Sequence, residues 1–168
     1  MPTAKPPRHR VAKKEVHRPW PLLQRPGFLI RRMHQIHVAL FQQACASFDV
    51  TPLQYSLLSA LAERGAADQT TLAADIAQDR TTTTGALKRL AARKLVERAI
   101  DGNDRRARLC RLTPAGAALL SRLETPAREA HRATLGRLTK KEQAVFIAMM
   151  QRMVAEQADE SIDVQSDD

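Results

Sequence analysis

Apolar residues recur at helical spacing over most of the chain. From Gly27 onward they lie three or four positions apart, which predicts an amphipathic helix of about 20 residues. A capping box of Thr51 and Gln54 predicts the start of a second helix, and Gly65 is suited to end it. Each helix is therefore expected to turn one apolar side toward a common core. The stripe of the first helix comprises Leu29, Met33, Ile36, Leu40 and Ala44.

Two shorter helices are expected next. Residues 70–78 predict a short helix, with Ile76 and Ala77 among its inward-facing residues. Thr81 is a suitable N-cap for the following helix, which should run to about Lys94. Thr81 also begins a run of four threonines, which are poor helix formers. Their position at a helix start makes sense if their hydroxyls are needed there.

Strand-like alternation appears in residues 96–100 and 109–113. These segments flank the turn-rich, basic residues 101–108, and the pattern predicts a β-hairpin with a basic tip.

Two more helices follow the predicted hairpin. Thr113 can cap the first of them, which Pro126 is expected to kink or split. A capping box of Thr139 and Glu142 opens the last helix, which should fade near Ala158. Its methionine cluster, Met149, Met150 and Met153, is expected to lie in a dimer core rather than to bind a ligand.

Composition supports this helical pattern. Hydrophobic residues form 43% of the 168 residues and aromatic residues only 4%, which favours helices built on Ala and Leu. The length suits one domain, or one domain with an added dimerisation part. Two cysteines make no disulfide framework, so a reducing cytoplasm is expected. The sequence predicts neither a membrane helix nor a secretory signal, because no apolar run approaches ~18 residues.

The excess of basic residues indicates an anionic partner. The chain has 27 Lys and Arg against 18 Asp and Glu, a net charge of +9. Basic residues gather in residues 1–32 and 80–111, whereas residues 156–168 carry six acids and no base. We interpret residues 1–26 as a mobile basic arm, which either lies along DNA or is simply solvated, and residues 159–168 as an acidic tail.

The order of elements within residues 51–113 predicts a winged helix-turn-helix. In such a module one helix enters the major groove of DNA, and the hairpin reaches along the backbone or into a minor groove. Here the Thr-rich helix and the basic hairpin take those positions, and Gly85 removes a side chain where the backbone can approach DNA closely. The candidate DNA-binding residues are Thr81, Thr82, Thr84, Lys88, Arg89, Asp104, Arg105, Arg106 and Arg108.

Two motifs in this region resemble those of the MarR family of bacterial transcriptional regulators. Residues 79–90 match the recognition-helix pattern D-x-S-x-x-T-x-x-[VL]-x-x-L, with threonine in place of serine. Residues 104–106 and 112–116 match the wing pattern D-x-R followed by L-T-x-x-G. The helical layout extends the resemblance to about residues 27–158. A departure is Gly85, where many relatives carry arginine.

The resemblance implies a mainly α fold, a winged helix-turn-helix with a short β-hairpin wing and a helical dimerisation region. Residues 27–50 and 114–158 would form the dimerisation helices of a homodimer, and residues 51–113 the DNA-binding part. The dimer would read a roughly palindromic site in double-stranded DNA, with Arg106 in the minor groove and Asp104 orienting it. Such proteins are commonly repressors released by a small aromatic acid.

Four residues are candidates for binding that acid. Arg31, His34 and His37 lie one turn apart on the first helix, where they could hold a carboxylate, and Tyr55 could bond a ring substituent. The alternative is that these histidines bind no ligand, because a histidine on a helix is as readily exposed to solvent or hydrogen-bonded within a dimer. The stretch RPGFLIRRMHQI resembles regulators of aromatic-acid catabolism, including nicotinate-pathway repressors.

Two other functions are considered. A ligand-independent architectural protein would bind DNA with little sequence preference. An enzyme using Cys45 is disfavoured, because nothing places a nucleophile, a base and oxyanion donors together. Cys45 and Cys110 are expected to pack rather than to sense oxidants. No cofactor motif and no paired metal-ligand spacing is present, so neither cofactor nor metal is expected.

Overall fold

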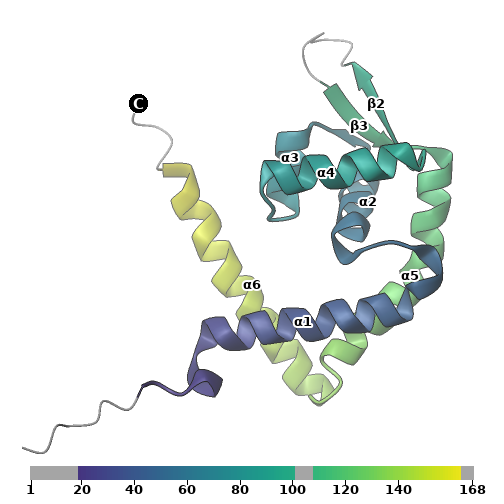
Figure 1. Ribbon diagram of the computed structural model, residues 1–168. Helices are drawn as coiled ribbons and strands as arrows, with labels where there is room; N and C mark the ends of the chain where they lie inside the picture. Colours follow the sequence, from purple (N-terminus) through teal and green to yellow (C-terminus); the bar gives the residue numbers. More distant parts are fainter. Residues whose placement is uncertain (1–18, 101–107, 164–168) are drawn as a thin grey trace, which may run out of the picture.

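The computed structural model describes residues 19–100 and 108–163, and the side chains of residues 99, 100, 108 and 156–163 lie outside that description. Within these residues the chain forms six α-helices, two short 3-10 helices and a three-stranded antiparallel sheet (Figure 1). This mainly α architecture with a β-hairpin confirms the predicted fold class.

The winged-helix lobe holds three helices and the sheet. Its helices are α2 (Pro52–Arg64), α3 (Gln69–Asp75) and α4 (Arg80–Ala92). Its strands are β1 (Ala66–Ala67), β2 (Val96–Ile100) and β3 (Arg108–Leu112), in the order β1-β3-β2. The hairpin of β2 and β3 is close to its predicted bounds, with Arg98 opposite Cys110. The sequence pattern does not predict β1, because two alanines carry no alternation.

An apolar core fills this lobe and continues into α1 and α5 through Phe41 and Leu123. Leucines from all three helices are almost fully buried in it, together with Cys110 from the sheet. Burial raises the pKa of the Cys110 thiol, which keeps the thiol protonated and agrees with a packing role. The central leucines are Leu57, Leu58, Leu61, Leu72, Leu87 and Leu90.

The helix starts confirm some predicted caps and correct one. Thr51 and Gln54 form the predicted capping box, and the Thr113 hydroxyl accepts from the N–H of Gly116. At α4, however, the cap is Asp79, whose carboxylate accepts from the N–H of Thr82 at 2.8 Å. Thr81 is therefore not the cap but lies in the first turn, because the helix begins earlier than predicted.

The turn between α3 and α4 also differs from expectation. Helix α3 ends at Asp75, short of the predicted residue 78. Ala77 then adopts a left-handed conformation with φ 50° and is exposed rather than facing inward. The N–H of Gln78 returns to the carbonyl of Ala73 at 2.9 Å. This compact turn delivers the chain to Asp79 and fixes the start of α4.

Two long helices form the other side of the molecule. Helix α1 (Pro26–Ala44) packs along α5 (Pro114–Thr134), as Figure 1 shows. Pro126 does not split α5, which is continuous from end to end. The loss of one backbone donor is tolerated there because packing against α1 and α2 holds both halves in line.

Helix α6 (Lys140–Asp163) diverges from the rest of the chain (Figure 1). It continues to Asp163 instead of fading near Ala158, so the segment predicted as an acidic tail begins within the helix. Its apolar residues Val145, Met149 and Met153 are exposed, as are Leu29 and Ile36 from the predicted stripe of α1. In the part of the chain described here, no helix is long and apolar enough to cross a membrane.

Two junctions join the winged-helix lobe to the long helices. Arg93, at the end of α4, donates to the backbone carbonyls of Phe48 and Asp49 in the turn between α1 and α2. At the second junction, a Cβ added to Gly116 would lie 2.0 Å from the carbonyl oxygen of Leu95. A side chain is thus excluded at Gly116, which explains physically the glycine of the L-T-x-x-G motif.

Candidate nucleic-acid interface and ligand cavity

One face of α4 is turned to solvent and carries four of the five DNA-binding side chains predicted for this helix. Thr81, Thr82, Lys88 and Arg89 are exposed, while the opposite face of the helix is buried against the core. The structure thus brings these four residues together on one outward surface. A helix face with hydroxyl and cationic groups matches the edges and phosphates that a major groove presents.

The four threonines do not all face outward. Thr83 is fully buried, and its hydroxyl donates to the carbonyl of Asp79 at 2.9 Å. The Thr84 hydroxyl is half-buried and donates to the carbonyl of Arg80 at 2.7 Å, with Gln69 Oε1 at 3.1 Å. Only Thr81 and Thr82 of the run are exposed. The poor helix propensity of this run is therefore explained partly by internal bonding and only partly by an outward-facing role.

Asp79 anchors this face electrostatically. Hydrogen bonds from the hydroxyl and the N–H of Thr82 lower the pKa of the Asp79 carboxyl, so it is ionised at neutral pH. An anion at the N-terminus complements the helix dipole and satisfies N–H groups that would otherwise lack partners.

The tip of the predicted wing lies outside the described residues. This applies to Asp104, Arg105 and Arg106, and for Arg108 only the backbone, at the start of β3, is described. The antiparallel pairing of β2 and β3 nevertheless fixes where the hairpin leaves the lobe, beside α4 (Figure 1).

A histidine cluster joins α1 to α5. The rings of His37 and His131 stack with centroids 4.6 Å apart. His37 Nδ1 lies 2.9 Å from the hydroxyl oxygen of Thr134, which itself lies 2.8 Å from the carbonyl oxygen of Ala130. Because the carbonyl only accepts, the Thr134 hydroxyl donates to Ala130 and accepts from His37 Nδ1–H. Nε2 of neutral His37 is then left as an acceptor.

The charge state of His37 follows from these neighbours. Burial lowers its pKa, and the nearby His131 and His34 lower it further, so His37 is neutral at pH 7. A bound carboxylate would reverse this balance by favouring the protonated ring.

His34 and His37 also line a cavity of about 390 Å³ between α1, α2 and the turn after α3. That volume is suited to a single small aromatic molecule. The apolar part of the lining comes from Val38, Pro52, Leu53 and Ile76, and its polar part includes Ser56 and Gln78. Sequence reasoning did not single out Ser56 or Gln78, because neither belongs to a motif and only the fold brings them opposite the histidines.

The other two predicted ligand residues lie elsewhere. Arg31 is exposed, with its guanidinium 5.7 Å from the centre of the Phe28 ring. Tyr55 packs against Phe41 at 5.5 Å between centroids, and burial is the main cause that raises the pKa of its phenol. Neither residue lines the histidine cavity.

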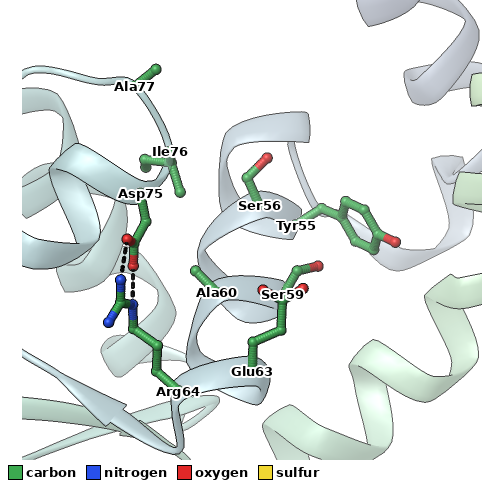
Figure 2. Close-up of a pocket in the computed structure, with 9 residues that line it drawn as sticks. All are labelled: Tyr55, Ser56, Ser59, Ala60, Glu63, Arg64, Asp75, Ile76 and Ala77. Atoms are coloured by element: carbon green, nitrogen blue, oxygen red, sulfur yellow. Dashed lines mark hydrogen bonds and ion pairs between the residues drawn. The ribbon is translucent and has the colours of Figure 1, made fainter. Parts of the chain in front are cut away.

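Tyr55 borders a second, larger hollow of about 650 Å³ on α2 and the end of α3. Figure 2 shows its ring extending away from the ion pair of Arg64 and Asp75 on the other side of α2. Nη2 of Arg64 donates to Asp75 at 2.6 Å, so this guanidinium already has a carboxylate partner within the chain. For a carboxylate ligand the histidine cavity is therefore the better candidate.

Comparisons with known proteins agree with this geometry. A model of the MarR family matches residues 48–107. The HTH-type transcriptional repressor NicR of Pseudomonas putida is 33% identical over 136 residues, which cover 81% of this chain and 86% of NicR.

Two solved structures are similar over most of their length. One is a structure of Bordetella bronchiseptica BpsR that concerns the regulation of its DNA binding by 6-hydroxynicotinic acid. BpsR is 34% identical, the match covers 81% of this chain and 97% of BpsR, and the TM-score is 0.76. The other is the PcaV transcriptional regulator of Streptomyces coelicolor in complex with its natural ligand. It is 31% identical, the match covers 81% of this chain and 96% of PcaV, and the TM-score is 0.72.

Proposed function

Because the chain belongs to the MarR family of transcriptional regulators, we propose that it is a homodimeric repressor. In this proposal it binds a roughly palindromic operator and is released by a small aromatic carboxylic acid. The observation that carries the proposal is the shared wall between the cavity and the DNA-binding helix. Ile76 and Gln78 line the histidine cavity, and the next residue, Asp79, is the N-cap of α4. A molecule that moves this wall would reorient α4.

For DNA binding we assign α4 to the major groove. Thr81, Thr82, Lys88 and Arg89 would contact phosphates and base edges, with Thr84 limited to accepting because its hydrogen is already used. The predicted wing residues, Asp104 to Arg106 and Arg108, would contact the adjacent minor groove.

For dimerisation we assign the exposed apolar residues of α1 and α6. Val154 of α6 is 71% exposed and Met153 59%, and Ile30 of α1 is 62% exposed. Apolar surface on this scale is suited to a protein partner. A second copy is the partner that a two-fold operator requires, since it presents a second α4 to the next half-site.

For the ligand we assign an aromatic acid related to hydroxylated nicotinate, by analogy with 6-hydroxynicotinic acid and BpsR. Its ring would lie against the apolar lining, and its carboxylate would accept from protonated His37 or from His34. A ring hydroxyl or ring N–H would bond Ser56 or Gln78. The contacts predicted for Arg31 and Tyr55 require movement on binding.

The test is release from DNA. An operator is first selected from a randomised duplex library, and its Kd is measured at one salt concentration with and without 6-hydroxynicotinate, nicotinate and protocatechuate. We expect one acid to weaken binding at least tenfold, which is about 1.4 kcal/mol of coupling. His37→Ala should bind the operator normally but lose release, whereas Gln35→Ala, exposed on the same helix, should retain it.

Two results would contradict the proposal. Uniform affinity for all duplexes with a steep salt dependence would identify a ligand-independent architectural protein. Tight operator binding that none of the three acids changes, with no shift of Tm, would remove the proposed ligand class.

A further inference from the structure

Gly85 in the middle of α4 is not required by the fold of the chain itself. It lies inside a regular helix, and it is not among the described glycines with positive φ. A Cβ added there would meet only Nη1 of Arg89, at an ordinary contact distance of 3.6 Å. Glycine also weakens a helix relative to alanine. Its presence on the solvent face therefore calls for a reason outside the monomer.

Arg89 lies one turn after Gly85 on the same face of α4. Nη1 of its guanidinium lies 3.6 Å from the position that a Cβ of residue 85 would occupy. Arg89 takes part in none of the ion pairs formed among the described residues. The outward face of α4 thus has a cation lying close to the helix surface at its centre, where a side chain at position 85 would otherwise stand.

A guanidinium close to the helix surface reaches a base edge only if the helix itself comes close to the floor of the groove. The absence of a side chain at Gly85 permits that approach. Arginine at such a position donates two hydrogen bonds to O6 and N7 of guanine, a pairing that no other base offers. We propose that Gly85 and Arg89 act as one base-reading unit that recognises a guanine in each half-site, an inference that rests on the proposed DNA-binding function.

Lys88, the neighbour of Arg89, provides the matched control. It is exposed on the same helix, but its ammonium is a point charge without the two-pronged geometry of a guanidinium. We expect Lys88 to contact phosphate, so its loss should weaken binding to all sequences alike.

The experiment selects duplexes from a randomised library with the full-length protein and with four variants, Arg89→Ala, Gly85→Leu, Lys88→Ala and Gly85→Ala. The wild type should select a guanine at one fixed position of each half-site. Arg89→Ala should lose that preference by about fivefold to hundredfold, the range of one bidentate contact, and keep the others. Gly85→Leu should lose the same preference, because its side chain displaces the guanidinium.

Two further readouts separate base reading from a structural role. Lys88→Ala should select the wild-type sequence with weaker affinity. Gly85→Ala should raise Tm and yet weaken operator binding, since its methyl lies in the path of the DNA; unchanged binding with raised Tm would overturn the close approach.

If Arg89→Ala selects the wild-type sequence with uniformly lower affinity, Arg89 contacts phosphate and the proposal is overturned while the proposed function stands. If the wild type enriches no sequence at all, both are overturned.

Discussion

The winged-helix lobe and the long helices α1 and α6 differ in how much of their apolar surface the chain itself buries. Leucines of α2, α3 and α4 are almost fully buried in one core, and the helix starts are capped within the lobe. On α6, by contrast, Met149, Met150 and Met153 are all exposed. The core of the lobe is thus filled by the chain itself, with Phe41 of α1 and Leu123 of α5 added to it, whereas the apolar side of α6 is not covered by the described residues. Folding of the lobe and association of the proposed dimer should therefore respond to different substitutions.

The largest effect is expected at the junction between the lobe and α5. Gly116→Ala places a Cβ 2.0 Å from the Leu95 carbonyl oxygen, and neither atom can move without a shift of the backbone that holds it. We expect a loss of about 3 kcal/mol or more in the free energy of unfolding. Urea denaturation followed by circular dichroism measures it. Gly27→Ala, with nothing within 4 Å of the added Cβ, is the control and should not destabilise; an equal loss in both variants would contradict the steric explanation.

A second, smaller effect should weaken association of the proposed dimer without unfolding the lobe. Met149→Glu combined with Met153→Glu introduces charge into the exposed apolar side of α6. We expect association at least a hundredfold weaker, about 2.7 kcal/mol, because two methionine side chains lose their burial in each subunit. Analytical ultracentrifugation measures the dissociation constant. Gln151→Glu adds a charge at another exposed position and should leave it nearly unchanged; if the double variant stays dimeric, α6 is not the interface.

A third effect depends on pH and involves His37, which joins α1 to α5. Its folded-state pKa is lowered, first by burial and then by His131 and His34, so the neutral ring is favoured. The stabilising contribution is complete above the unfolded pKa of about 6.5 and is lost as pH falls toward the folded-state pKa. We expect Tm to decline over that range, and His37→Gln to reduce the decline. An identical pH profile in the variant would assign the effect to other groups.

The smallest effect should strengthen the lobe alone. Ala77 has φ 50°, a conformation that glycine adopts without strain. Ala77→Gly should stabilise the lobe by up to about 1 kcal/mol, with dimerisation unchanged. Thermal unfolding at several protein concentrations separates the two contributions. A decrease in Tm would show that the greater entropy of glycine in the unfolded chain outweighs the relief of strain.

Sequence patterns predicted most of the fold because its helices are punctuated by local signals. Thr51, Thr113 and Thr139 cap the helices where expected, since a cap depends on residues three positions away. The sequence predicts Thr81 as the cap of α4, but the helix begins after Asp79, and both residue types are good caps, so local preference does not distinguish them. Pro126 shows the opposite case, in which tertiary packing overrides a local helix breaker.

The candidate sites were predicted less evenly. The outward face of α4 follows from helical periodicity, so Lys88 and Arg89 could be identified from spacing alone. The cavity depends on contacts between α1, α2 and the end of α3, and periodicity does not reveal which residues of α2 face His37. For that reason the sequence predicts Tyr55, whereas the structure places Ser56, one position away, in the lining of the cavity. Membership of a family of DNA-binding transcription factors confirms the prediction that the chain is not an enzyme.

The bond pattern of Arg93 has a consequence for how such a protein changes during evolution. The guanidinium holds the carbonyls of Phe48 and Asp49, which are main-chain groups that every amino acid supplies. Substitutions at positions 48 and 49 therefore leave the acceptors in place. The turn between α1 and α2 can therefore change its side chains while its connection to the end of α4 is inherited unchanged.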